Sequence, residues 1–168
     1  MAWHGSTDTK DRIFAALPYL LPLFYVVYAA PNPFQPFSYF LLKSFAILRV
    51  ILIPLEPVKL LYTFIPFAGL VIFFVLFLAV VRNERISHFI RFNTLQAILL
   101  DLLLFLLALA FNIIVSPLLG GNLFALEIVY NIVFLGVLAL CGYGIVQSLF
   151  GRYAEIPNLS EAVYAQVR

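Results

Sequence analysis

The hydrophobic residues of this chain lie in long continuous runs that charges rarely interrupt. No charged residue lies between Lys59 and Arg82, between Asp101 and Glu127, or between Glu127 and Arg152, and each gap is longer than twenty residues. About twenty helical residues, at about 1.5 Å each, cross the roughly 30 Å hydrocarbon layer of a bilayer. In lipid only a helix or a closed barrel satisfies its backbone, and these runs lack strict alternation, so the pattern predicts helices.

The runs and the turn signals between them predict an all-α integral membrane protein with a single membrane domain over residues 1–168. PNPFQP, residues 31–36, ends the first run because proline removes amide donors. Pro117 and the glycines before Asn122 end the third run. A cleaved signal peptide ending near residue 29 is an alternative for the first run, but Pro18 and the length of the run disfavour it. Four transmembrane helices are predicted at about 13–30, 62–81, 94–116 and 126–150.

A further segment, residues 37–61, is apolar but carries four charges. On a helical wheel Arg49, Glu56 and Lys59 fall within roughly 60° of one another, with Lys43 off that face, and Pro54 interrupts the helix. A membrane span would place Arg49 near the bilayer centre at about 2.5–3.5 kcal/mol. The pattern therefore favours an interfacial or re-entrant helical segment between the first and second spans over a fifth span.

The distribution of lysine and arginine predicts the orientation of the chain. With four spans, one side of the membrane holds seven of these residues and the other side holds three. The positive-inside rule then places both termini in the cytoplasm-like compartment. Five spans with the N-terminus outside would keep six positive residues inside, and only the burial of Arg49 argues against that arrangement. The seven residues are Lys10, Arg12, Arg82, Arg85, Arg91, Arg152 and Arg168, and the three are Lys43, Arg49 and Lys59.

Composition narrows the function. The chain is 64% hydrophobic and 11% charged with a net charge of +2, and its basic residues form no stripe, so no nucleic-acid partner is expected. Cys141 lies within an apolar run and is interpreted as a small buried hydrophobic residue. His4 and His88 lack partners at a ligand spacing, so no metal is assigned. No nucleophile with a base, phosphate loop or paired carboxylates is recognisable, so neither an enzyme nor a cofactor is predicted.

The densest charge cluster is VVRNERISHFIRFNTLQ, residues 80–96. If residues 84–91 are helical, the charged side chains occupy an arc of about 120° and the apolar side chains occupy another. Glu84 and His88, at i and i+4, would then support each other. We therefore expect a connection between the second and third spans that lies along the membrane surface, with Arg82, Arg85, His88 and Arg91 as candidate functional or partner contacts.

Asp101 and Asn112 are the candidate residues within the third span. A carboxylate there is costly unless it is paired or wetted, which marks a functional or assembly contact. Alternatively the helix starts late and Asp101 lies just below the headgroups, and the sequence leaves both interpretations open. Asn112 falls on almost the same helical face as Asp101, which predicts that the two residues belong to one polar stripe along the third span.

The tail, residues 152–168, returns to the composition of a soluble protein. Asn158 followed by Glu161 is typical of a helix start, and it predicts a short helix over 158–167. Leu159 and Val163 would line one side of this helix, which would then be a docking element. A frayed tail is the alternative.

Two stretches resemble a known family. VVRNERISHFIRFNTLQAILLDLL, residues 80–103, and AEIPNLSEAVYAQV, residues 154–167, are similar to the twenty-kilodalton subunit of the protein translocon of the chloroplast inner envelope. RIFAALPYLLPL, residues 12–23, and IPFAGL, residues 65–70, fit the same family. The resemblance implies a four-helix membrane protein with both termini on the stromal or cytoplasmic side.

The resemblance also implies a function and a location. As a channel component or scaffold, the protein would take part in preprotein passage across the inner envelope, or in an ancestral cyanobacterial counterpart. Its partners would be other translocon membrane subunits, the transiting polypeptide, the lipid bilayer and, in a homo-oligomer, a second copy of the chain. The polar start does not resemble a transit peptide, which predicts a cyanobacterial or plastid-encoded member, in a cyanobacterial plasma or thylakoid membrane or the chloroplast inner envelope. A small-solute transporter or a membrane-complex assembly factor is the alternative function.

Overall fold

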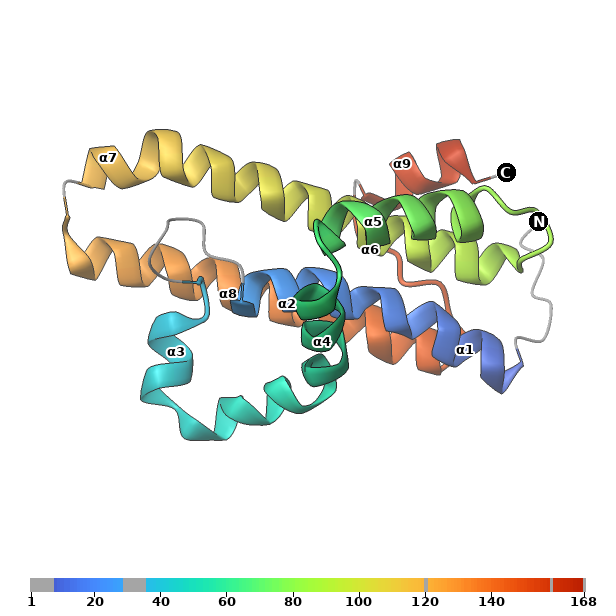
Figure 1. Ribbon diagram of the computed structural model, residues 1–168, viewed down its shortest axis with the longest axis horizontal. Coiled ribbons are helices and arrows are strands. Elements are labelled where there is room, and N and C mark those ends of the chain that lie inside the picture. The colour runs from blue at the N-terminus through green and yellow to red at the C-terminus, as the bar shows by residue number, and fades with distance from the viewer. Residues whose placement is uncertain (1–7, 29–35, 120, 158, 168) are drawn as a thin grey trace.

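Helices account for the regular structure throughout the described part of the chain (Figure 1). The computed structural model describes residues 8–28, 36–119, 121–157 and 159–167. Three helices in these ranges are long and apolar enough to cross a membrane, and there are up to four if a sharply bent helix pair is one span. The structure therefore agrees with an all-α membrane protein, and the bent pair is where it departs from the simplest four-helix arrangement.

The first long helix runs from Thr9 to Tyr28. It consists of α1 (Thr9–Ala16), a 3-10 turn η1 (Leu17–Tyr19) and α2 (Leu20–Tyr28). The Asp8 carboxylate accepts a hydrogen bond of 2.7 Å from the Thr9 amide and caps the start. The 3-10 turn contains Pro18, which lacks the amide hydrogen that a regular α-helix would use there.

The second long helix runs from His88 to Leu119 and is the longest element, at 32 residues. It comprises α6 (His88–Ala110), a π-helical turn η4 (Phe111–Val115) and α7 (Ser116–Leu119). The hydroxyl of Ser87 caps its start by accepting from the Ile90 amide at 3.5 Å. The π-helical turn ends two residues before Pro117, whose missing amide interrupts the regular hydrogen-bond ladder.

The third long helix, α8 (Leu123–Leu149), returns antiparallel to the second (Figure 1). It begins after a tight turn in which Gly121 has a φ of 81°, a left-handed conformation that glycine adopts without steric cost. The Asn122 side chain accepts from the Ala125 amide at 3.2 Å and caps the helix. Uncharged turn residues thus connect the two longest helices, as the sequence predicts.

The span predicted at 62–81 is not a single helix. The chain forms α4 (Glu56–Phe64), breaks, and continues as α5 (Ala68–Val75) and a π-helical turn η3 (Leu76–Val81), with a bend of 108° at the break. Pro66 lies in the break and restricts Ile65 to an extended conformation, and Phe67 has a left-handed φ of 54°. The straight portion after the bend reaches only about 20 Å, which is less than the hydrocarbon thickness.

The segment predicted to be interfacial or re-entrant projects from the side of the bundle (Figure 1). It contains α3 (Tyr39–Ser44), a 3-10 helix η2 (Ala46–Leu55) that passes through Pro54, and α4. Its charges have partners close by in the chain. Arg49 Nε donates to the Leu42 carbonyl at 3.4 Å, and Lys43 Nζ lies 5.5 Å from the centre of the Tyr39 ring.

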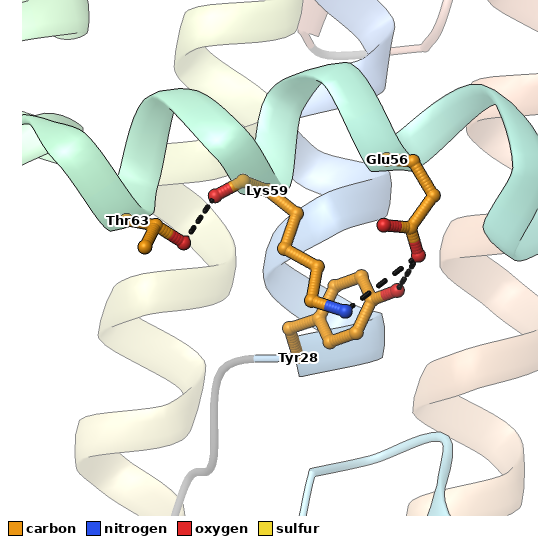
Figure 2. Close-up of polar contacts among 4 residues, drawn as sticks. All are labelled: Tyr28, Glu56, Lys59 and Thr63. Carbon is orange, nitrogen blue, oxygen red and sulfur yellow. Dashed lines mark hydrogen bonds and ion pairs between the residues drawn. The ribbon is translucent and has the colours of Figure 1, made fainter.

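Figure 2 shows how the remaining two charges of this segment are tied to the first span. Lys59 Nζ and the Tyr28 hydroxyl both point to Glu56 Oε1, at 3.6 and 3.4 Å. Lys59 Nζ also lies 5.4 Å from the centre of the Tyr28 ring. Because a carboxylate, an ammonium and an aromatic ring satisfy one another here, α4 is held against the end of α2.

The main hydrophobic core lies between α2, α6 and α8. Phe37, at the start of the side segment, enters this core and contacts the rings of Phe111 and Tyr130, with centroids 5.9 and 5.2 Å away. A second cluster forms where the C-terminal helix α9 (Leu159–Gln166) packs on α6. The tail helix predicted at 158–167 thus agrees with α9, while the proposed capping residue Asn158 lies outside the described residues.

Candidate functional site

The charged connection between η3 and α6 is a turn, not the surface helix expected from the sequence. Residues 82–87 form turns and bends, and α6 begins only at His88. The Asn83 side chain accepts a hydrogen bond of 3.1 Å from the Arg85 amide, which favours a turn over a helix. The helical arcs predicted for residues 84–91 are therefore wrong, and Arg82, Glu84 and Arg85 are exposed.

His88 and Arg91 hold neighbouring segments of the chain. The His88 ring lies between two groups of the tail, with Nε2 3.1 Å from the Val167 carbonyl and Nδ1 3.1 Å from the Tyr153 hydroxyl. A carbonyl only accepts, so Nε2 carries the hydrogen and Nδ1 accepts from Tyr153. Burial raises the pKa of Tyr153, which keeps this donor protonated at neutral pH. Arg91 Nε donates to the Val81 carbonyl at 2.8 Å and satisfies the end of η3.

The tail is docked by apolar contacts as well as by His88. Val163 and Val167 are buried beside Phe92 in the second hydrophobic cluster. The Tyr164 ring lies 4.7 Å from the ring of Phe92, and its hydroxyl donates to Glu155 at 3.2 Å. Burial, together with the Glu155 carboxylate, raises the pKa of Tyr164. This is the docking element expected from the sequence.

A buried polar node, which the sequence analysis did not single out, joins three helices at the same end of the molecule. Asn93 Oδ1 accepts from the Tyr19 hydroxyl at 3.1 Å and from the Ser148 hydroxyl at 3.2 Å. Its Nδ2 donates to the Phe89 carbonyl at 2.9 Å. Gly144 leaves room for the Tyr19 ring, which would overlap a Cβ at that position. In the sequence Asn93 lies beside Thr94 within the polar stretch of residues 80–96, and nothing there indicates that it is buried.

Asp101 and Asn112 do not form one polar stripe. Asn112 is exposed and donates to the Ala108 carbonyl at 3.1 Å, one turn back along its own helix. Asp101 instead lies at the wall of a lateral cavity, with Oδ1 buried and without a hydrogen-bond partner among the described residues. Of the six residues predicted as contacts, Asp101 is the one that lines this cavity among the described residues.

This cavity has a volume of about 630 Å³ and lies at the bend between α4 and α5. α2, α4, α5 and α6 each contribute to it. Apart from Asp101 the described lining residues are aromatic or apolar, so among them the carboxylate is the one charged group. The lining residues are Phe24, Tyr25, Tyr28, Tyr62, Gly69, Leu70, Phe73, Asp101, Leu102 and Phe105.

The side chains of the candidate site are suited to binding a ligand. No group of three histidine, cysteine or acidic residues among the described residues could hold a metal ion. Cys141 is buried in the main core, as its apolar surroundings in the sequence predict. The candidate site is therefore an aromatic cavity with one carboxylate among its described lining residues.

Comparison with known proteins places these features in a family. The sequence model described as "Chloroplast import apparatus Tic20-like" matches residues 8–163. The chain belongs to the Tic20 family. It is 48% identical over 168 residues to a Tic20 family protein of Synechocystis sp., covering 100% of this chain and 99% of that relative.

More distant Tic20 relatives come from plastid-bearing organisms. The chain is 34% identical over 168 residues to protein TIC 20-v, chloroplastic, of Arabidopsis thaliana, covering 96% of this chain and 73% of the relative. It is also 34% identical over 172 residues to the Tic20 family protein Ycf60 of Gracilaria tenuistipitata var. liui, covering 94% and 75%. The resemblance noted in the sequence is therefore confirmed along nearly the whole chain.

Proposed function

We propose that this chain is a membrane subunit of a protein translocon. As a channel component or a scaffold, it would contribute to preprotein passage across the chloroplast inner envelope or in a cyanobacterial counterpart. The observation that carries the proposal is the Tic20 match over residues 8–163, with a family described as part of an import apparatus. A relative from Synechocystis that is matched over almost its full length supports a role for the whole chain and not for one segment.

The exposed apolar faces of the long helices support a role among other membrane subunits. Large hydrophobic side chains are exposed along both α6–α7 and α8, and surfaces of this size need lipid or partner helices to cover them. Side chains fill the core between α2, α6 and α8, so a path wide enough for a polypeptide would form between this chain and its partners. The exposed residues include Leu103, Leu106, Ile113, Leu118, Leu123, Ile132 and Val146.

The arrangement of the ends supports the proposed orientation. The start of α1, the turn at 82–87 and α9 lie at the same end of the molecule (Figure 1). That end carries Arg82, Arg85 and Arg152, all exposed. Under the positive-inside rule, we place it on the cytoplasmic or stromal side.

Affinity purification from native membranes tests the proposal. A tagged full-length chain, extracted in mild detergent, should copurify with larger membrane proteins at stoichiometric levels by mass spectrometry. With a photoreactive residue in place of Arg85 or Leu118, it should also cross-link to a polypeptide arrested during passage. A chain that purifies without partners and fails to cross-link from either position would contradict the proposal.

A further inference from the structure

The cavity at Asp101 combines three properties that together specify a class of ligand. The first is size, because about 630 Å³ falls within the roughly 300–1,000 Å³ of typical small-molecule sites. One lysine or arginine side chain would leave most of that volume empty. The occupant therefore needs an apolar body as well as a polar group.

The second property is the chemistry of the wall. Asp101 supplies the one carboxylate among the described lining residues, and its Oδ1 is buried without a hydrogen-bond partner among the described residues. The rings of Phe24, Tyr25 and Tyr62 surround the same space. Aromatic faces attract organic cations, and a carboxylate strengthens that attraction by charge. The Tyr28 hydroxyl donates its hydrogen to Glu56, and Asp101 is the one carboxylate among the described lining residues.

The third property is the direction of entry. Leu70, Leu102 and Phe105 line the cavity and are also exposed on the outer surface, at 60%, 44% and 52%. They belong to helices whose outer faces are apolar. A ligand would therefore enter sideways, from the bilayer, and would need to be amphipathic.

A second cavity provides a comparison within the same molecule. It measures about 800 Å³ and lies between α1, α2, α4, η3 and α6. Its lining is apolar except for the single hydroxyl of Thr94. Acyl chains would fill such a space without selectivity, whereas the Asp101 cavity presents a charge to its ligand.

We propose that the Asp101 cavity binds an amphipathic amine, with its ammonium group against the Asp101 carboxylate and the aromatic rings and its apolar part toward the bilayer. The ammonium could belong to an aminophospholipid headgroup or to a free lipophilic amine. Both sources share the chemistry that the cavity recognises. This inference does not depend on the role in protein transport.

Photolabelling of the full-length chain tests this proposal. The chain is reconstituted in vesicles of digalactosyldiacylglycerol, a neutral lipid without an amine, and exposed to dodecylamine carrying a diazirine. Labelled peptides should come from α2, α5 and α6 around the cavity. Excess dodecanol, which has the same chain without the charge, should leave the labelling unchanged.

Three variants distinguish an effect of the Asp101 charge on ligand binding from an effect on folding. Asp101→Asn should reduce cavity labelling by at least about tenfold, because hydrogen bonds to charged groups contribute about 1.5–3 kcal/mol. Asp101→Glu retains the charge and should retain labelling. Glu127→Gln removes another carboxylate of a long helix that does not line the cavity, and it should label like the original chain.

Competition identifies the source of the ammonium. Protection by dioleoylphosphatidylethanolamine assigns the site to a lipid headgroup, and protection by phenethylamine alone assigns it to a free amine. Equal labelling of Asp101→Asn, with an unchanged circular dichroism spectrum, would overturn the proposal. So would equal competition by dodecanol, or competition only by an apolar peptide bearing one lysine, since the occupant would then be a protein.

Discussion

Single polar side chains decide how the helices meet at the end of the molecule that holds the tail. Asn93 accepts two hydroxyl hydrogens from α8 and the first long helix, and His88 binds two groups of the tail. In an apolar environment each of these hydrogen bonds stabilises the fold, because breaking it would leave a polar group buried without a partner. The sequence places His88 in the charge cluster of residues 80–96, but it does not indicate what the residue binds.

Gly144→Ala should destabilise the protein by about 1–3 kcal/mol, because the added Cβ would overlap the buried ring of Tyr19. Thermal unfolding in detergent, followed by circular dichroism, measures the change. Gly136→Ala and Gly142→Ala are matched controls on the same helix, where no atom lies within 4 Å of the added Cβ. Equal stability of all three variants would show that Tyr19 does not pack against α8 as described.

Gln96→Leu should stabilise the protein by about 1–3 kcal/mol, because both polar atoms of this fully buried side chain lack a partner among the described residues. Asn93→Leu on the same helix should destabilise the protein instead, because it would leave the hydroxyls of Tyr19 and Ser148 buried without their acceptor. Chemical unfolding of both variants compares them directly. A loss of stability in Gln96→Leu would mean that the amide has a partner.

At the scale of elements, local sequence signals and tertiary contacts compete. Pro66 breaks the predicted span at 62–81, and Asn83 with Ser87 delays the start of α6 until His88. Each signal was visible in the sequence, but periodicity over a longer window favoured a continuous helix. The docked tail shows the reverse, since a short helix of eight residues is marginal alone and packing on α6 stabilises it.

His88→Ala should loosen α9, because it removes the hydrogen bonds to Val167 and Tyr153. We expect amide hydrogen exchange in residues 159–167 to accelerate by up to about thirtyfold, since the two bonds together contribute about 2 kcal/mol. Arg85→Ala, which removes an exposed side chain three residues earlier, should leave exchange unchanged. Unchanged exchange in His88→Ala would assign the docking to Val163 and its apolar neighbours alone.

At the scale of the whole molecule, the path of the chain returns both described ends to one side (Figure 1). Three long helices and the bent pair produce this result only if the bent pair completes a crossing. Whether the chain crosses the membrane four times, as the sequence predicts, therefore depends on the bent pair. Its charges at Arg49, Glu56 and Lys59 are paired locally, which lowers the cost of placing the segment near lipid.

Cysteine labelling tests this topology. Cys141 is the single cysteine, so Cys141→Ala gives a background free of thiols. In that background, Arg85→Cys and Glu161→Cys should react with a membrane-impermeant maleimide from one side of sealed vesicles. Asn122→Cys, in the turn between α7 and α8, should react from the opposite side. Reaction of Arg85→Cys and Glu161→Cys from different sides would contradict two crossings by α6–α7 and α8. Lys10→Cys should react from the same side as Arg85→Cys, and reaction from the other side would show that the bent pair does not complete a crossing.

The sequence by itself determined where the chain can enter a membrane and which family it resembles, because lipid imposes a minimum length and internal backbone hydrogen bonding on every crossing. It also marked Asp101 as unusual, since a carboxylate in an apolar run is costly wherever that run packs. Only the tertiary structure decided that Asp101 faces an aromatic cavity while Asn112 turns away, and that His88 binds the tail. Those outcomes depend on contacts between residues far apart in the chain, such as Tyr25, Tyr62 and Asp101, and periodicity carries no information about them.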